Sequence, residues 1–444
     1  MLPLPRVAVG AFEPGGSYRP MLWALVDALR RQGLNIQPFF SSAYFSAHRA
    51  TATFAGATPR HLDSWLMSPE LCRELFVRGA GACDLAVIEG EFGHGAPDAM
   101  GATLESLCQW LELPRLVVLD DSRHSGCLPP PPAKIDGVLI DCVETGPRLA
   151  RRMIEIETQW EVPVLGSLEI PATLRAALEE LAPGSRPSRE LCHTLGDHFL
   201  RTGEPERVVE IASRCPITWG HPHLLSKESP LAGVVVALAY DDALNCYFPD
   251  TLDLLELRGA TIVDFSPLRD GELPEADIVY LGDGCPERYA AQLSDNECMR
   301  LAVRAHIRKG GRIYAEGGGA AYLCQHIETA QGMHRMVGIL PAIARFQDRC
   351  EPPRPVEFSL AEPCWLGAAG ATLRGYLDER LQLEPTGNLI RCVGGGAPSD
   401  AMVKCCRAIG SRAQLNFAAQ PELLSMFFRY AESESDDADP WQSC

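Results

Sequence analysis

The sequence lacks the features that would point to several large classes of protein. No run approaches the roughly 20 uncharged apolar residues of a membrane-spanning helix. Positive charge is scarce, with 40 Lys and Arg against 58 Asp and Glu and a net charge of -18. A general nucleic-acid binder needs a basic face. We therefore expect neither a membrane nor a nucleic acid as a partner.

A disulfide framework and a structural metal site are also absent from the pattern. The 17 cysteines are scattered without a CxxC pair, and the histidines show no metal-ligand spacing. Several cysteines sit in apolar segments, where a thiol behaves as a small hydrophobic group. The N-terminus shows no signal-peptide pattern. We therefore expect reduced thiols and a cytoplasmic protein.

What the sequence does contain is an alternation of strand-like and helix-like segments, which is typical of a parallel sheet covered by helices. The alternation occurs twice. In the first series we expect a helix over 20–33, mainly helix from 172 to 214, and strands at 5–11, 37–40, 84–89, 116–119, 137–140 and 162–165. In the second series we expect helices at 251–259 and 295–309 and strands at 234–239, 261–264, 278–281 and 312–315.

The two series predict two domains. Residues 215–231 carry three prolines and no clear period, which indicates a linker between them. The first domain would span 1–214 and the second 232–430. Residues 431–444 form an acidic stretch that we expect to be a disordered tail.

Four segments of the second half, in this order and spacing, resemble the glutaminase-like domain of cobyrinic acid a,c-diamide synthases. They are YDDALNCYFPD (240–250), FSPLRD (265–270), LGDGCPE (281–287) and YAEGGGAAYL (314–323). In the first half, HLDSWLM (61–67) and DLAVIEG (84–90) look like segments of the same family's ATP domain.

The resemblance implies an α/β fold of two domains. The N-terminal one would be a P-loop-NTPase-like, dethiobiotin-synthetase-like parallel-sheet domain. The C-terminal one would be a class I glutamine amidotransferase-like domain. The family's activity is ATP-dependent, glutamine-hydrolysing amidation of cobyrinic acid side chains in cobalamin biosynthesis, with ATP and Mg²⁺ as its cofactors. Whether this chain has that activity depends on its site residues.

The resemblance places a phosphate-binding loop at residues 12–20. Such a loop needs glycines, a lysine for the outer phosphates and a hydroxyl for Mg²⁺. Tyr18 stands at the lysine position, and Arg19 and Pro20 stand at the hydroxyl positions. We expect a degenerate loop that does not hydrolyse ATP. Its residues are Gly15, Gly16, Ser17, Tyr18 and Arg19.

Two further positions bear on nucleotide binding. Glu89 ends a strand where the family's carboxylate serves Mg²⁺, so it is either a metal ligand or a surviving structural acid. Asp141 replaces an Asn that resembles the family's adenine-binding residue, which weakens base recognition.

The glutaminase site has lost its chemistry according to the same resemblance. Glutamine hydrolysis needs a thiolate and a histidine base. The nucleophile's position is Gly317, and Gln414 and Asn416 replace the two histidines of a His-x-His pair. A neutral amide cannot act as a general base at pH 7. Cys324 is expected about two turns along the following helix, out of reach and in the core.

One cluster of family residues is retained, namely Asp241, Asn245, Tyr247 and Asp250. It would contact a tetrapyrrole or the partner domain, or it would only shape the entry to a helix, with Pro249 and Asp250 at the first turn. Both interpretations stay open.

Three hypotheses follow. The chain is a pseudoenzyme that binds a corrinoid-like tetrapyrrole or a protein partner, either an active paralogue or a second copy of itself. Alternatively it is an amide-forming ligase that acts on a tetrapyrrole carboxylate with ATP and free ammonia. The third possibility is a scaffold or regulator unrelated to tetrapyrroles.

Overall fold

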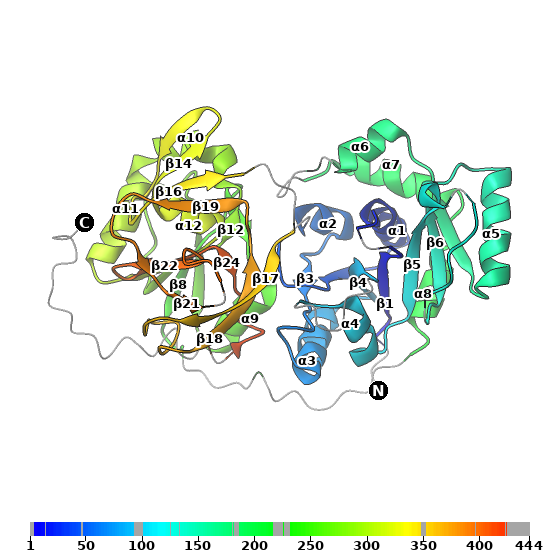
Figure 1. Cartoon of the computed structure of the whole chain (residues 1–444), viewed down its shortest axis with the longest axis horizontal. Helices are drawn as coiled ribbons and strands as arrows, with labels where there is room; N and C mark the ends of the chain where they lie inside the picture. Colours follow the sequence, from blue (N-terminus) through cyan, green and yellow to red (C-terminus); the bar gives the residue numbers. More distant parts are fainter. Residues whose placement is uncertain are drawn as a thin grey trace. The chain divides into compact units, whose positions relative to one another are not determined.

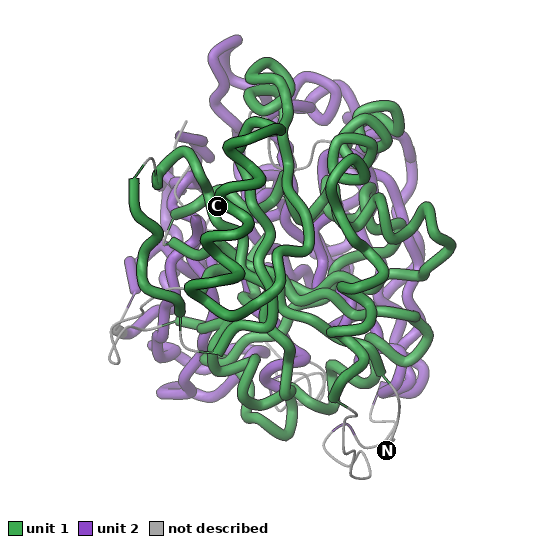
Figure 2. Tube along the Cα trace, turned by 90° about the vertical axis from the view of Figure 1, so that its right-hand side faces the viewer, with its two compact units in different colours: residues 1–224 green, residues 225–444 purple. Residues whose placement is uncertain are grey.

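The computed structural model describes residues 4–13, 15–45, 48–92, 101–124, 126–132, 134–179, 181, 186–215, 225, 231–347, 352–395, 397–421 and 423. The chain divides into two compact units, residues 1–224 and 225–444 (Figure 2). The division falls within the range 215–231 that the sequence indicates as a linker, most of which lies outside the described residues. The expected tail, 431–444, also lies outside them.

Unit 1 is built on a seven-stranded sheet with the order β3-β2-β4-β1-β5-β6-β7, in which all neighbouring strands are parallel (Figure 1). Its strands are β1 (Arg6–Ala11), β2 (Ile36–Phe40), β3 (Arg60–His61), β4 (Leu85–Glu91), β5 (Arg115–Asp120), β6 (Gly137–Asp141) and β7 (Val164–Leu168). Its helices are α1 (Arg19–Arg31), α2 (His48–Ala55), α3 (Pro69–Ala80), α4 (Leu104–Trp110), the 3₁₀ helix η1 (Asp121–Arg123), α5 (Pro147–Gln159), α6 (Ala172–Glu179), α7 (Arg189–Leu200) and α8 (Pro205–Ala212).

Helices cover both faces of this sheet because successive strand residues point to opposite sides. Leu139 packs into the cluster formed with α1, α2, α7 and α8. Its neighbours Val138 and Ile140 pack instead with Leu149 and Ile156 of α5. These strands are therefore apolar along their whole length, which is why short continuous apolar runs identified them in the sequence.

Strand β1 lies between β4 and β5 at the centre of the sheet. In parallel α/β sheets, ligand sites lie beyond the carboxyl ends of the strands, near the point where strand order reverses. The segment from Phe12 to Tyr18, the end of β4 and the end of β6 therefore belong to one edge of unit 1.

Unit 2 has its own seven-stranded sheet with the order β10-β8-β11-β13-β23-β22-β20. Its first five strands are parallel and the last two are antiparallel additions. These strands are β8 (Val235–Ala239), β10 (Thr261–Phe265), β11 (Ile278–Leu281), β13 (Arg312–Glu316), β20 (Ile390–Arg391), β22 (Met402–Cys405) and β23 (Ala408–Ser411). The helices of unit 2 are α9 (Pro249–Leu257), the 3₁₀ helix η2 (Pro286–Tyr289), α10 (Ala290–Asp295), α11 (Glu297–Arg308) and α12 (Gly318–Leu323).

Three smaller sheets complete unit 2. They contain β9 (Leu244–Cys246) with β12 (Asp283–Gly284); β14 (Cys324–Thr329), β15 (Gly332–Arg335), β16 (Leu340–Phe346) and β19 (Leu381–Pro385); and β17 (Arg354–Leu360), β18 (Thr372–Leu377), β21 (Val393–Gly395) and β24 (Ala413–Gln414). No described helix is long and apolar enough to cross a membrane.

One expected placement is wrong. Cys324 does not lie on the helix that follows Gly317, because α12 ends at Leu323 and Cys324 opens strand β14. Its predicted burial is confirmed, since the side chain is fully buried and its thiol donates to Ala320 O.

Two candidate ligand sites

The loop between β1 and α1 makes a tight turn at its glycines. Gly15 has φ +66°, a conformation that glycine adopts without strain. The N–H of Gly16 donates to Glu13 O at 2.9 Å, and Tyr18 precedes the first residue of α1. The turn is retained, so the question is which side chains now surround it.

Arg19 turns toward the end of β4 and not toward the loop's own N–H groups. Its Nε lies 3.5 Å from Glu89 Oε1, and Glu89 is 2 % exposed. Burial raises the pKa of Glu89 to about 7, and the positive charge of Arg19 limits that rise. Arg19 thus supplies the positive charge next to the carboxylate that the sequence placed at a metal position.

Tyr18 is buried in the core of unit 1, packed with residues of α1 and β1. Burial raises the pKa of its phenol, so this side chain remains uncharged. It therefore provides no cation for phosphate.

Acidic side chains hold the loop from both sides. The N–H of Gly15 donates to Glu91 Oε2 at 3.3 Å. Glu13 makes an ion pair with Arg123 at 3.3 Å, and its Oε1 lies 2.9 Å from Nε2 of His124. A backbone donor that a P-loop would offer to phosphate is here used by a carboxylate.

Asp141, at the end of β6, is also engaged within unit 1. Arg175 donates to both of its oxygens, at 2.6 and 3.0 Å. Burial raises the pKa of Asp141 while this bidentate contact lowers it. This ion pair with Arg175 favours a structural role for Asp141.

In unit 2, three neighbouring strands end at one edge of the sheet. Strands β11, β13 and β23 are adjacent and parallel. Asp283 follows β11, Gly317 follows β13, and Gln414 follows β23. This topology brings together two positions from the sequence analysis, Gly317 and Gln414, and adds Asp283, which that analysis did not single out.

Gly317 retains the sharp strand-to-helix turn that an amidotransferase nucleophile requires. Its φ of +46° and ψ of -113° lie where residues with a side chain are strained. A Cβ built there would overlap the carboxylate of Asp283. The space into which a side chain at 317 would project is therefore filled by Asp283.

Asp283 is 4 % exposed and takes three hydrogen bonds. Its Oδ1 accepts from Gly318 N at 2.7 Å and from Gly284 N at 2.8 Å. Its Oδ2 accepts from Gln414 Nε2 at 2.6 Å. Burial and the nearby charge of Asp378 raise the pKa of Asp283, whereas the N–H donors lower it. The backbone N–H of Gly318, at the start of α12, and that of Gly284, in β12, are thus bonded to an internal carboxylate.

Asn416, the second amide that replaces a histidine, makes hydrogen bonds to the backbone. Asn416 is fully buried, and its Oδ1 accepts from Ala418 N at 3.0 Å and from Ala419 N at 3.3 Å. Glu316, the last residue of β13, is bonded to the segment that carries Asn416. Its Oε1 accepts from Tyr314 Oη at 2.6 Å and from Leu415 N at 3.2 Å. Burial raises the pKa of Glu316 to about 8.

A thiol does occur in the same loop as Asp283, but it is not activated. Burial raises the pKa of Cys285 to about 12, so it stays protonated at neutral pH. Of the histidines described in unit 2, His306 bonds Arg312 O and His334 bonds Thr329 Oγ1. Neither forms a nucleophile–base pair with that thiol.

Comparisons with known proteins show which family this chain resembles. Residues 235–376 match the CobB/CobQ-like glutamine amidotransferase domain family. A cobyrinate a,c-diamide synthase from Salmonella typhimurium is 32% identical over 373 residues, which cover 79% of this chain and 80% of that protein. One from Listeria innocua is 30% identical over 393 residues, which cover 84% of this chain and 86% of that protein.

The chain belongs to the cobyrinate a,c-diamide synthase family. The resemblance seen in the sequence is therefore confirmed over most of the chain, and so is the pairing of a P-loop-like parallel sheet with an amidotransferase-like domain.

The cluster retained from that family is used inside unit 2. Asp241 accepts from Ala243 N at 2.8 Å and from Ser266 Oγ at 2.9 Å. Tyr247 donates to Ala239 O and accepts from Gly282 N at 2.8 Å. These contacts favour a structural role for both residues.

The other two members of the cluster fit the same interpretation. Asn245 Nδ2 donates to Asp241 O and Asp242 O, both at 3.1 Å. Asp250 lies in the first turn of α9 with Pro249 at its start, as a helix entry requires.

Asp283 is the site residue that the sequence analysis missed. The available signal was an acid between two glycines, Gly282 and Gly284, in the segment LGDGCPE that carries the family resemblance. A second missed feature is the ion pair of Asp378 with Arg380, at 2.8 Å. Among the described residues, no group of three or more metal-ligating side chains gathers anywhere.

Proposed function

We propose that this chain is a non-catalytic member of the cobyrinate a,c-diamide synthase family. It would keep the fold of both units and bind a corrinoid-like tetrapyrrole. A second role of the same fold would be binding to an active paralogue. The relatives are named for amidation of cobyrinate, which motivates this ligand class.

One observation carries the proposal. The carboxylate of Asp283 lies where a side chain at Gly317 would project, and it uses the N–H of Gly318. An oxyanion formed during amide hydrolysis needs such preorganised N–H donors. With no thiol at 317, an amide in place of each base, and the donor already bonded, glutamine hydrolysis has no support in unit 2.

Unit 1 gives separate support. The residues around the loop do not fit Mg²⁺–ATP as the family would hold it, because Arg19 pairs with Glu89 and Tyr18 is a buried neutral phenol. Arg and Lys are also not interchangeable as phosphate anchors. The ion pair places a positive charge, 3.5 Å away, beside the carboxylate that a metal would otherwise contact.

The test uses the purified full-length chain. Glutamate release from glutamine and phosphate release from ATP with Mg²⁺ should both equal the buffer blank. Titration with cobyrinic acid should shift the corrinoid absorbance bands in a saturable manner. ATP turnover that depends on both cobyrinic acid and ammonia would instead establish the ligase alternative, and glutamate release would overturn the proposal outright.

A further inference from the structure

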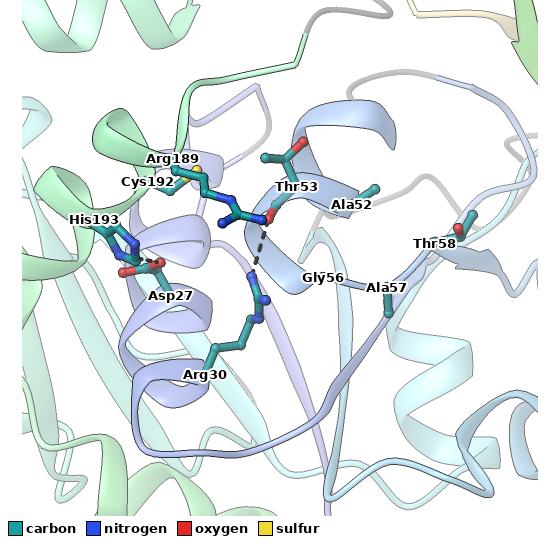
Figure 3. Close-up of a pocket in the computed structure, with 10 residues that line it drawn as sticks. All are labelled: Asp27, Arg30, Ala52, Thr53, Gly56, Ala57, Thr58, Arg189, Cys192 and His193. Carbon is teal, nitrogen blue, oxygen red and sulfur yellow. Dashed lines mark hydrogen bonds and ion pairs between the residues drawn. The ribbon is translucent and has the colours of Figure 1, made fainter. Parts of the chain in front are cut away.

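Unit 1 has a pocket of about 660 Å³ whose lining does not include the loop at residues 12–18 (Figure 3). This volume lies within the range of small-molecule sites. It is formed by α1, α2, the segment after α2, and α7. The lining residues are Asp27, Arg30, Ala52, Thr53, Gly56, Ala57, Thr58, Arg189, Cys192 and His193.

Two arginines face this pocket, and the one acid of its lining, Asp27, pairs instead with Arg31 and His193. Arg30 Nη1 donates to backbone carbonyls, Phe54 O at 2.7 Å and Thr53 O at 3.3 Å. Arg189 makes no ion pair or hydrogen bond within the part of the chain that the structure describes. Figure 3 shows the two guanidinium groups, from α1 and α7, directed toward each other near Thr53. These two positive charges and His193 outnumber the single carboxylate of the lining, Asp27, so an anion would stabilise the arrangement.

This arrangement contrasts with the other arginines near the sheet of unit 1. Arg152 pairs with Asp121 at 2.6 Å, and Arg175 pairs with Asp141 at 2.6 Å. The chain as a whole has 58 acidic against 40 basic residues, so acidic partners are plentiful. Among the described residues, the exposed side chain of Arg189 has no such partner and is available to a ligand.

The backbone around the arginines keeps the pocket open. Gly56 has φ +71°, and a Cβ there would lie 2.5 Å from Arg30 Nη2. Arg189 is the first residue of α7, whose positive end favours a nearby anion. His193, one turn further along α7, is held at the pocket by Asp27, with Nδ1 3.6 Å from Oδ1.

We propose that this pocket binds a small phosphate-bearing metabolite. Arg30 comes from α1, and Arg189 and His193 come from one face of α7, so donors from two helices can contact several oxygens of a tetrahedral phosphate. The site is independent of the corrinoid-binding role proposed above, and either can fail without the other.

The experiment is calorimetric titration of the full-length chain with inorganic phosphate, pyrophosphate and succinate as probes. Pyrophosphate should bind saturably and more tightly than succinate. Arg189→Ala should weaken pyrophosphate binding by roughly tenfold or more, the effect of losing a charged hydrogen bond. This variant should fold normally, because it removes a positive charge from the positive end of α7.

Two matched variants locate the binding. Arg201→Ala removes the same charge from an exposed residue at the other end of α7, and Ser17→Ala alters the loop after β1. Both should bind pyrophosphate as the unmodified chain does. Equal weakening by Arg189→Ala and Arg201→Ala would overturn the site in favour of a general charge effect. Loss with Ser17→Ala alone, preference for succinate, or no binding tighter than about 1 mM would overturn it as well.

Discussion

The two candidate sites are closed by side chains of opposite charge. In unit 1 a cation, Arg19, pairs with the carboxylate of Glu89 at the end of a strand. In unit 2 an anion, Asp283, accepts hydrogen bonds from the N–H of Gly318, at the start of α12, and from the N–H of Gly284. Each substitute carries the charge that a ligand there would bring, a metal cation beside the acid or an oxyanion beside the N–H groups. The proposed loss of catalysis is compatible with retention of the fold for this reason.

The sites differ in how deeply the substitute is buried. The side chain of Arg19 is 35 % exposed, whereas Asp283 as a residue is 4 % exposed. A partly exposed ion pair is screened by water and contributes little, but a buried carboxylate with three donors is costly to disturb. We therefore expect changes in unit 2 to have larger effects than equivalent changes in unit 1.

The largest effect is expected when a thiol is placed at position 317, in the strand-to-helix turn after β13. Gly317→Cys adds a side chain at φ +46° and forces it against Asp283. Strain and overlap together should destabilise unit 2 by about 3–5 kcal/mol, lowering its unfolding temperature by roughly 6–15 °C. Differential scanning calorimetry of the variant and the unmodified chain measures this shift.

The partner variant tests the cause. Asp283→Gly combined with Gly317→Cys removes the overlap, so the double variant should be more stable than the sum of the single effects predicts. If the two changes are additive instead, Asp283 does not occupy the space of the missing side chain. The double variant should still release no glutamate from glutamine, because Gln414 supplies no base.

A second, smaller effect concerns the pH dependence of unit 2. Glu316 has a folded-state pKa of about 8 against an ordinary 4.5. The stability it contributes is complete below pH 4.5 and is lost as the pH rises through 8. Glu316→Gln cannot ionise, so it should exceed the unmodified chain by about 2 kcal/mol at pH 8 and match it near pH 4.5. Glu272→Gln, at an exposed position, is the control and should change neither value.

The fold could be predicted well because its signal is local. The strands around Val87, Val117 and Leu139 are buried on both faces, so each appears in the sequence as a continuous apolar run. The predicted ends of the strands were less accurate. A strand was expected over 162–165, but β7 begins at Val164. Val162 lies in the preceding turn and packs against the apolar cluster that includes α5. The sequence did not predict the strand order of the small sheets of unit 2, since pairs such as β16 with β19 and β18 with β24 join segments far apart in the chain.

The sequence predicted which functional groups are missing from the two sites, but not which side chains take their place. Missing groups, such as the side chain at Gly317, follow from a resemblance position by position. What replaces them does not, because Asp283 and Gln414 are 131 residues apart and meet only through the order of strands in the sheet. The same holds for Arg19 and Glu89, whose pairing needs β1 and β4 to be neighbours.

The smallest effect is expected from the pair in unit 1, and a double-mutant cycle isolates it. Arg19→Met leaves Glu89 buried without its cation, which should cost about 1 kcal/mol at pH 8, discounted because Arg19 is partly exposed. Glu89→Gln removes the charge that needs the cation, so the double variant should recover much of that loss. Since the pKa of Glu89 is about 7, the coupling should shrink at pH 5, where the carboxyl is protonated. A coupling that is as large at pH 5 as at pH 8 would mean that the two side chains interact by packing, and that the charge substitution proposed for unit 1 is absent.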